Sequence, residues 1–342
     1  MNPLKNQRIG WIDYTKSIAI FFVILIHTHC NDAVTVTLKS FTMPIFFFVS
    51  GFLFSRERNP DYGAFAVKRF RQLVVPYIWI NAVAYVAWLL VLRHYGADSD
   101  AGPAWHEPLI AATLGLPSGL SHDIPLWSLL CFFVVEMVYY PLQRSLIKND
   151  AVIALIFFIV ASVVALLRPQ GPPELPLSLT PSLTAMIFYA LGHLASVNRQ
   201  KLEGMWRPNL VLLLTGVLMV AAGVTFNTPV SFFIGKTGNP IFFIIGATGG
   251  ILSMIQISVI LSSIKKDPGI IRFISRGTLI ICGFHLLALA GIKGILMFGF
   301  GIDPSILTVG LLRGIAMSIG ALVLCMPIIW FIERYARFLV SK

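Results

Sequence analysis

The chain has 342 residues, of which 57% are hydrophobic and only 12% are charged, and its mean hydropathy is +0.82. A soluble domain carries about twice this share of charged residues, so the composition excludes a soluble protein and indicates one embedded in a membrane. The net charge of +11 would suggest nucleic-acid binding in a soluble protein, but in a membrane protein its distribution reports topology instead. The four cysteines are scattered without metal-ligand spacing, which favours free thiols packed within helices.

Apolar runs that approach or exceed the ~18–20 residues needed to cross a bilayer predict ten transmembrane helices. In chain order they cover roughly residues 15–32, 35–54, 73–92, 125–143, 151–167, 182–198, 209–226, 241–264, 277–298 and 306–332. The sequence therefore predicts an all-α, polytopic membrane helix bundle that forms a single domain over residues 1–342. The first run follows basic residues as a signal peptide would, but no small-x-small cleavage site follows it, so we expect this helix to be retained.

The basic residues are divided unequally between the two sides of the predicted bundle. Twenty of the 26 Lys and Arg residues lie in the segments 1–16, 55–72, 144–150, 199–208, 265–276 and 333–342, which share one side. By the positive-inside rule this side, which includes both termini, faces the cytoplasm. On the other side we expect a long loop over 93–124 and a proline-rich segment over 168–181 that is not a regular helix. A G-x-x-x-G pattern at 246–250 predicts close helix packing.

The first predicted helix carries ionisable side chains within the stretch "WIDYTKSIAIFFVILIHTH", residues 11–29. On a helix, Lys16 and His27 are ~16 Å apart along the axis and within ~20° of one face, so one elongated ligand could touch both. Lys16 stands where cytoplasmic phosphates would arrive, and His27 is expected near the middle of the hydrocarbon core. His29 points about 200° away from His27, so the two are not a chelating pair. Asp13, one turn before Lys16, is positioned to pair with it or to act directly.

A histidine inside the membrane is a functional hypothesis by default, although it can also be a structural histidine hydrogen-bonded between helices. The lysine on the same helix face favours the functional interpretation. Histidine titrates near neutral pH, so His27 is a candidate general base that deprotonates a hydroxyl, or a nucleophile that accepts an acyl group covalently. Both mechanisms are compatible with this pattern.

Several motifs along the chain are similar to those of one protein family. The stretch "KSIAIFFVILIH" (16–27) has a basic residue, ten residues and a histidine, and it is followed by "FTMPIFFFVSGFLFS" (41–55), "VKRFRQLVVPY" (67–77), "IPLWSLLCFF" (124–133) and "ISRGTLIICGFHLL" (274–287). Together they resemble the acyltransferase-3 family of bacterial integral membrane acyltransferases, the O-acetyltransferases of surface polysaccharides and related glycans. The resemblance is strongest in residues 1–80. Ser128 stands where the family often has Phe, a difference that would change a pocket wall.

The resemblance implies a reaction and some of the residues that serve it. An acyl group, usually acetyl, would move from cytoplasmic acyl-CoA to a hydroxyl of a cell-surface or lipid-linked glycan at the bacterial inner membrane. The family's reactive histidine carries over to His27 and its basic motif residue to Lys16. Arg69 and Arg71 would bind the phosphates of the donor, although such residues also set topology and bind lipid headgroups. Acyl-CoA is a substrate here, and we expect no bound cofactor and no metal.

Five further residues are weaker candidates for contact with the substrates. His285 lies ~12 Å deep in the ninth helix, close to the depth expected for the histidine of the first helix, which favours a shared cavity. Glu136 and Arg313 lie within the fourth and tenth helices and would line this cavity, orient a histidine or form a structural ion pair, even with each other. Asp123 and Trp127 stand at an outer helix entrance, where a carboxylate and an aromatic ring would meet a sugar, although interfacial Trp is also typical of membrane proteins.

These features favour a membrane-embedded O-acyltransferase whose partners are acyl-CoA, a glycan acceptor and membrane lipids, and not nucleic acid. A multi-pass transporter or flippase of a glycan or lipid-linked intermediate is the alternative, because ten spans with buried ionisable residues suit it as well. Inverted repeats with paired, Gly/Pro-broken helices would favour a transporter, and the sequence contains no such repeats.

Overall fold

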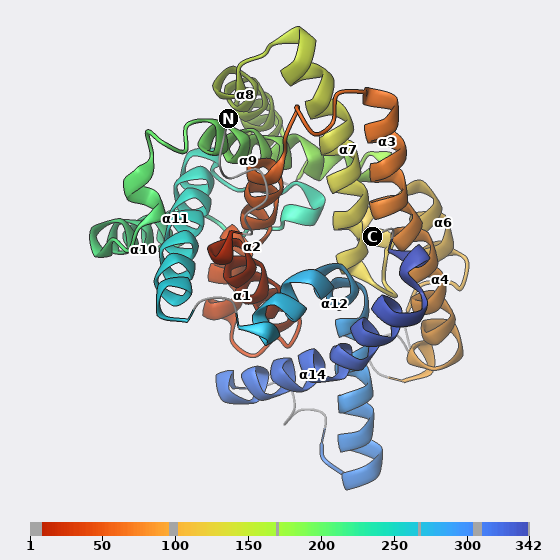
Figure 1. The fold of residues 1–342 in the computed structure, drawn as a ribbon. Coiled ribbons are helices and arrows are strands. Elements are labelled where there is room, and N and C mark those ends of the chain that lie inside the picture. The colour runs from red at the N-terminus through yellow and green to blue at the C-terminus, as the bar shows by residue number, and fades with distance from the viewer. Residues whose placement is uncertain (1–8, 96–101, 169–170, 266–267, 304–309, 341–342) are drawn as a thin grey trace.

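The computed structural model describes residues 9–95, 102–168, 171–265, 268–303 and 310–340 of the chain, and these fold as helices joined by turns (Figure 1). The α-helices are α1 (Gly10–Ile26), α2 (Asp32–Leu53), α3 (Tyr62–Arg69), α4 (Val75–Leu90), α6 (Glu107–Leu114), α7 (Trp127–Pro141), α8 (Asp150–Leu167), α9 (Leu179–Val197), α10 (Leu210–Thr225), α11 (Pro240–Ile264), α12 (Gly269–Gly294) and α14 (Leu311–Tyr335). Three π-helical segments extend them, at Phe70–Val74, Leu142–Leu146 and Ile295–Gly299. Short 3₁₀ turns cover Leu92–His94, Pro117–Gly119, Ile124–Leu126, Pro176–Ser178, Glu203–Trp206, Phe232–Ile234 and Arg337–Leu339.

The helices confirm the expected all-α, polytopic membrane bundle. Within the described residues, eight helical spans are able to cross a membrane by length and composition: Asp32–Leu53, Tyr62–His94, Ile124–Leu146, Asp150–Leu167, Pro176–Val197, Pro240–Ile264, Gly269–Gly299 and Leu311–Tyr335. α10 is apolar but shorter, with 16 residues, and α1 has 17. Each of the ten expected spans overlaps a helix in the described residues, although the first extends beyond its helix and residues 306–309 of the tenth lie outside the described residues.

The first helix is displaced from its expected position at 15–32. α1 begins at Gly10 and ends at Ile26, so His27 is its C-terminal cap and not a residue of its middle. The helix stops because a turn follows, in which His29 adopts a left-handed conformation with φ 53°, and Asn31 then caps α2 by accepting a hydrogen bond from the Val34 amide at 3.1 Å. The helix therefore ends earlier than the predicted limit of 32, because the apolar run of the sequence does not mark this cap.

The third span and the loop that follows it also differ from their predicted limits. The helix of the third span starts at Tyr62, where the Asp61 side chain accepts a hydrogen bond from the Ala64 amide, and continues through the π-helical turn into α4. The arginines of the third motif, which precede the predicted span of 73–92, are therefore helical. The expected long loop over 93–124 contains a helix of its own, α6, which ends at Gly115 in a left-handed conformation.

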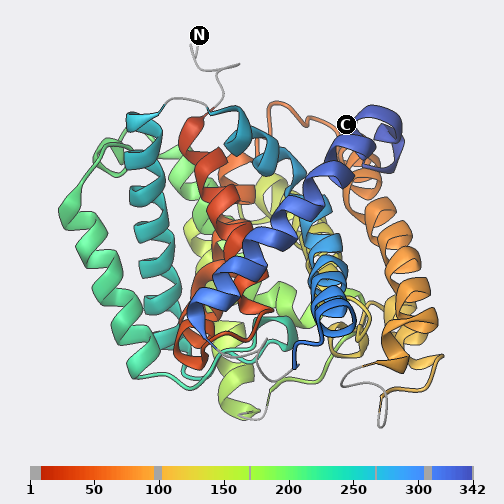
Figure 2. The same ribbon diagram turned by 90° about the horizontal axis from the view of Figure 1, so that it is seen from below.

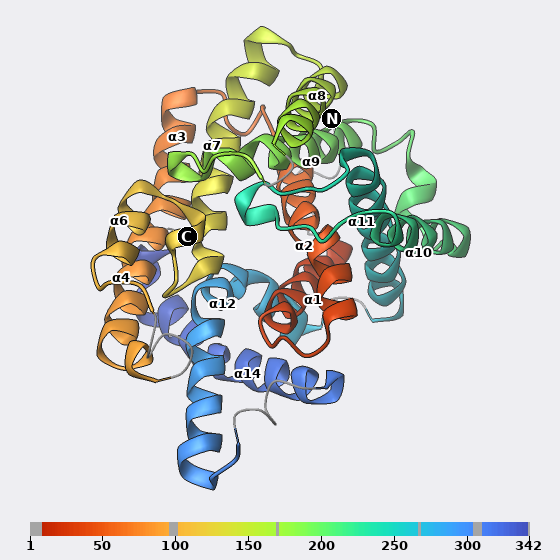
Figure 3. The same ribbon diagram turned by 180° about the vertical axis from the view of Figure 1, so that it is seen from behind.

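The two ends of the bundle carry different segments. Figure 2 shows that α1 begins at the same end at which α14 finishes, as expected for an even number of spans, and that α14 crosses the bundle diagonally. Figure 3 views the opposite end, where the chain between α10 and α11 lies across the bundle. We refer to the end with the start of α1 as the inner end and to the opposite end as the outer end.

Helices pack closely at glycine residues in two places, between α10 and α11 and between α2 and α9. A Cβ added to Gly223 of α10 would lie 2.4 Å from the Gly246 Cα of α11, and one added to Gly249 would lie 2.6 Å from the Gly216 carbonyl oxygen. The prediction from the G-x-x-x-G pattern is therefore confirmed. A similar contact joins α2 to α9, because a Cβ on Gly51 would lie 1.9 Å from the Tyr189 carbonyl oxygen. This second contact fixes the position of Ser50, the neighbour of Gly51, in the wall described next.

Candidate active site

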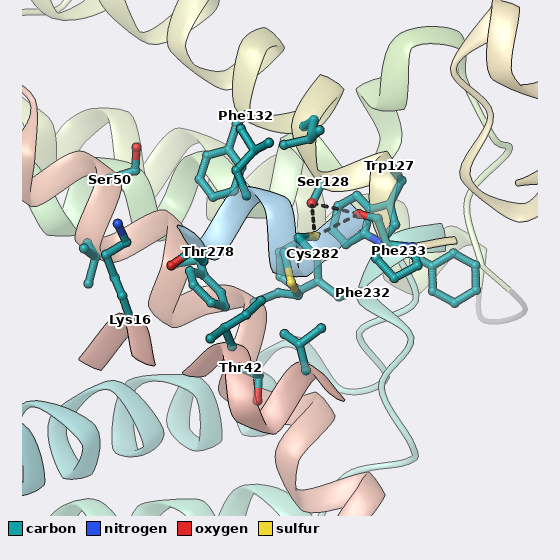
Figure 4. A pocket seen from close by; sticks show the side chains of 18 of the residues that line it. Lys16, Thr42, Ser50, Trp127, Ser128, Phe132, Phe232, Phe233, Thr278 and Cys282 are labelled. Atoms are coloured by element: carbon teal, nitrogen blue, oxygen red, sulfur yellow. Dashed lines mark hydrogen bonds between the residues drawn. The ribbon is translucent and has the colours of Figure 1, made fainter. Parts of the chain in front are cut away.

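An elongated cavity of about 480 Å³ lies among α1, α2, α7 and α12. Its wall follows α1 from Lys16 to Ile26, a distance of ~15 Å, and continues along the turn to His29. Figure 4 shows Lys16 and Ser50 toward one end of the cavity, with Trp127 and Phe233 toward the other. The wall is largely apolar, and its ionisable side chains are Lys16, His27, His29, Lys39, Arg69, Glu136 and Arg276.

An ion pair stands near the inner end of the cavity. The Arg69 Nε atom lies 2.7 Å from the Glu136 Oε2 atom, and the Ser50 hydroxyl donates a hydrogen bond to Oε1 of the same carboxylate at 3.2 Å. Arg69 also donates through Nη1 to the Gln72 amide oxygen at 3.0 Å, and its guanidinium lies 5.5 Å from the centre of the Phe65 ring. These contacts fix the guanidinium plane and leave further N–H groups able to meet a phosphate.

Lys16 and Arg276 add positive charge at this end, from α1 and α12. Both side chains line the cavity, and Arg276 lies 3.6 Å from the Glu333 carboxylate of α14. Two hydrogen bonds outside the cavity also join α1 to α12. Ser17 donates to the Ile271 carbonyl at 3.0 Å, and the Ser275 hydroxyl donates to the Asp13 carboxylate at 2.6 Å. Asp13 is therefore part of the contact between α1 and α12, and it does not line the cavity.

His27 lies toward the outer end of the same cavity, on the turn that follows α1. Its amide donates to the Ile24 carbonyl at 3.0 Å, and the Thr28 hydroxyl donates to the Leu25 carbonyl at 2.8 Å, so the turn is closed by local bonds. α14 packs on this turn: the Gly310 amide donates to the Cys30 carbonyl at 3.1 Å. The His27 ring is half-buried, lines the cavity, and forms no hydrogen bond within the described residues.

The ring of His285 lies directly beside that of His27. The ring centroids are 5.2 Å apart and the planes are inclined by 51°. His285 is fully buried on α12, and its Nδ1 lies 2.9 Å from the carbonyl oxygen of Ile281. The two histidines expected to share a depth are thus brought together, although only His27 lines the cavity.

The outer part of the cavity has an aromatic wall. Trp127 stacks on Phe232 with the ring centroids 6.0 Å apart, and Ser128 donates to the Pro125 carbonyl at 2.8 Å beside the Cys282 thiol (Figure 4). Ser128 does form part of the pocket wall, as its departure from the family pattern implied.

Asp123 and His122 lie behind this wall and do not line the cavity. The Asp123 carboxyl is 1% exposed, and within the described residues neither oxygen has a hydrogen-bond partner. Burial therefore raises the pKa of Asp123 well above its ordinary value. His122 donates through Nε2 to the Asn81 amide oxygen at 2.8 Å, and burial lowers the pKa of His122 to about 4. His122 is therefore neutral at pH 7, and burial of the Asp123 carboxyl favours its protonated form.

The candidates from the sequence divide into two groups. Those that line the cavity are Lys16, His27, Arg69, Glu136 and Trp127. Those that do not are Asp13, Arg71, Asp123, His285 and Arg313. Arg71 and Arg313 are exposed on their helices, and the ion-pair partner of Glu136 is Arg69 and not Arg313.

Sequence reasoning missed several side chains of the wall. Ser50, Thr278 and Cys282 lie in the motifs quoted above, so the motifs could have indicated them. That these three side chains line a cavity follows only from the arrangement of the helices (Figure 4). Lys39 and His29 had no motif to mark them. Within the described residues, no group of three or more His, Cys, Asp or Glu side chains is placed to hold a metal ion.

All five motifs meet in this one cavity. Lys16 and His27 come from the first motif, Ser50 from the second and Arg69 from the third, and the fourth and fifth contribute the segments 124–132 and 276–282. The family model for the acyltransferase domain named Acyl_transf_3 matches residues 9–330, nearly the whole chain. The chain belongs to the acyltransferase-3 family.

Membership of the acyltransferase-3 family makes this protein a membrane acyltransferase. No curated protein and no solved structure matches the chain. The roles of individual residues in this acyltransferase-3 protein therefore have to be argued from its own geometry.

Proposed function

We propose that the protein is an O-acyltransferase that moves an acyl group, most simply acetyl, from cytoplasmic acyl-CoA to a hydroxyl of a cell-surface or lipid-linked glycan. The observation that carries this proposal is one cavity that contains a cationic inner end and, ~16 Å further along, a histidine whose ring forms no hydrogen bond within the described residues. The positive-inside rule supports an inner end that faces the cytoplasm of a bacterial inner membrane.

The inner end suits the anionic part of acyl-CoA. Lys16, Arg69 and Arg276 line it and present ammonium and guanidinium groups, which bind phosphates well. Arg69 is the strongest candidate because Glu136, Gln72 and Phe65 hold its guanidinium in one orientation. Arg71 is exposed and away from the cavity wall, so an attraction of the donor or a contact with lipid headgroups suits it better.

His27 performs the chemistry in this proposal. On the general-base route it takes the proton of the acceptor hydroxyl while the oxygen attacks the thioester carbonyl. The C–S bond then breaks, and the sulfur leaves as CoA thiol with the proton that His27 returns. On the covalent route the ring nitrogen attacks the thioester, the C–S bond breaks, and CoA leaves as the thiolate. The hydroxyl of the glycan then attacks the acyl group, the C–N bond to His27 breaks, and the hydroxyl proton passes to the CoA sulfur. Both routes yield the same ester and CoA.

The acceptor is proposed to approach from the outer end. Trp127 and Phe232 offer aromatic faces there, which pack against the C–H face of a sugar ring, and Ser128 offers a hydroxyl. Asp123 lies behind this wall and acts on the acceptor only if the wall moves.

The test is to replace His27 by Ala in cells that produce the protein and to measure acyl groups released from surface glycans by mild alkali. We expect acylation to fall by about 10²- to 10⁴-fold. His106→Ala is the matched control, because His106 is exposed and lies outside the cavity. Normal acylation with normal amounts of the His27→Ala protein would refute the assignment.

A further inference from the structure

The contact between His285 and His27 has no role in the reaction as described so far. His285 is 0% exposed and does not line the cavity, so it has no access to either substrate. It does touch the one ring that the proposed reaction requires, at 5.2 Å between centroids. Any function of His285 in the transfer must therefore act through His27.

The hydrogen bond from His285 to Ile281 fixes where the His285 proton lies. Nδ1 is 2.9 Å from the Ile281 carbonyl oxygen, and a carbonyl only accepts, so Nδ1 carries the hydrogen. Burial favours the uncharged ring, since within the described residues no carboxylate pairs with it. In the neutral ring with Nδ1 protonated, Nε2 carries a lone pair and is a hydrogen-bond acceptor.

This acceptor nitrogen is unsatisfied. Nε2 of His285 is buried, and no hydrogen-bond donor reaches it within the described residues. A buried acceptor without a donor is unfavourable, and such exceptions in a folded protein call for an explanation. His27 is in ring contact with it and always carries at least one N–H group near neutral pH. The His27 ring forms no hydrogen bond within the described residues, so none of them commits its N–H group to another acceptor.

On the basis of the proposed function, we propose that His285 is a positioning residue for His27. Its Nε2 accepts a hydrogen bond from one ring nitrogen of His27 and thereby directs the other nitrogen, with its lone pair, into the cavity. On the general-base route the proton of the acceptor hydroxyl moves to this cavity-facing nitrogen, and His285 continues to accept from the opposite N–H. When CoA leaves, the same proton passes to its sulfur. On the covalent route the same lone pair attacks the thioester.

Two substitutions separate this role from packing. In His285→Gln, the side-chain carbonyl reaches the position of Nε2 and preserves an acceptor. In His285→Asn, the shorter amide preserves a donor toward Ile281 but offers no acceptor at the Nε2 position. Both replacements are neutral and polar, so a purely structural role would be affected similarly by the two.

The measurement uses inverted membrane vesicles from cells that produce each variant, with radiolabelled acetyl-CoA as the probe and the endogenous glycan as acceptor. We expect His285→Asn to lower the maximal rate of label incorporation by about 10²-fold, with the half-saturating acetyl-CoA concentration unchanged. His285→Gln should stay within about 5-fold of the unmodified protein, a far smaller loss than that expected from removal of the catalytic group.

Two results would overturn the positioning role: His285→Asn with an unchanged rate, or equal losses in the Asn and Gln variants at equal protein levels. If vesicles with the unmodified protein incorporate no label, the proposed function itself is contradicted. The comparison of the two variants tests only the positioning role of His285, so the two failures are distinguishable.

Discussion

Arg69 shows how a single residue is prepared for a ligand. Its guanidinium is bound on one side by the buried carboxylate of Glu136, by Gln72 and by the Phe65 ring, so little rotational freedom is left to be lost on binding. A planar fork of donors in a fixed orientation is suited to phosphate. Glu136, the carboxyl that lines the cavity, thus serves the donor site through a neighbouring cation.

We predict that Glu136→Gln weakens donor binding more than it slows the transfer. Without the carboxylate, Arg69 loses its ion pair and its orientation, so the half-saturating acyl-CoA concentration should rise by about 10-fold, equivalent to ~1.4 kcal/mol. Binding of acyl-CoA to the purified protein measures this directly. Glu203→Gln, which removes an exposed ion pair with Arg207, is the control and should leave binding unchanged. Equal affinities for all three proteins would contradict the role of Glu136.

The buried His122 predicts a pH dependence of stability. Its pKa is lowered from 6.5 to about 4 by burial, so below pH 6.5 the unfolded state binds a proton that the folded state does not. The contribution of His122 is therefore fully present above pH 6.5 and is lost as the pH falls toward 4, by up to ~3 kcal/mol. Thermal unfolding in detergent at pH 7 and pH 4.5 should show a smaller drop in Tm for His122→Gln than for the unmodified protein. Parallel drops would count against this assignment.

At the scale of elements, the turn after α1 depends on α14. A Cβ on Gly314 would lie 2.2 Å from the Cys30 Cβ and 2.8 Å from the Thr28 hydroxyl oxygen, so this helix touches the turn through a residue without a side chain. His27 is thus placed by a helix nearly 300 positions later in the chain. Such a contact explains why the last span is a component of the site, even though it contributes no residue to the cavity wall.

We predict that Gly314→Ala displaces the turn and lowers acylation by at least about 10-fold, because a 1 Å shift of a reacting group can cost as much as 10²-fold. Gly291→Ala in α12 is the matched control, since a Cβ there meets nothing within 4 Å. Surface glycan acyl groups per amount of protein give the comparison. Full acylation in the Gly314→Ala variant would show that the turn tolerates the added methyl group.

The same elements show what sequence patterns can and cannot predict. Periodicity and apolar length predicted the helices, because they follow from helical geometry. A similar depth predicted a cavity shared by His27 and His285, and the two rings do lie side by side, but only His27 lines the cavity. The end of α1 was not predictable, because a turn set by His29 and Asn31 interrupts an apolar run without a Gly or Pro signal. The direction of a side chain around a helix also depends on its neighbours, which is why Arg71 and Arg313 lie away from the cavity whereas Arg69 lines it.

At the scale of the whole molecule, the proposed reaction requires a fixed orientation in the membrane. The inner end carries the start of α1, the end of α14 and the cations Lys16 and Arg276, and cytoplasmic acyl-CoA must enter there (Figure 2). The positive-inside rule and the direction of donor supply thus require the same orientation.

We predict that green fluorescent protein fused to the C-terminus fluoresces in bacterial cells and that alkaline phosphatase fused at the same position is inactive. The first folds to a fluorescent state in the cytoplasm and the second requires an oxidising compartment. An alkaline phosphatase fusion between α10 and α11, at the outer end, should show the reverse behaviour. A fluorescent fusion at that outer position would contradict the assigned orientation.

The charge along the cavity has a consequence for the permeability of the membrane. Among the described residues, four lysine or arginine side chains line this cavity and one carboxylic acid does, so sodium ions and protons meet an electrostatic barrier along it. The aromatic rings of Trp127, Phe232 and Phe233 line the outer end with surfaces that water wets poorly. The protein can therefore reside in an energised membrane without conducting the sodium ions and protons whose gradients the cell maintains.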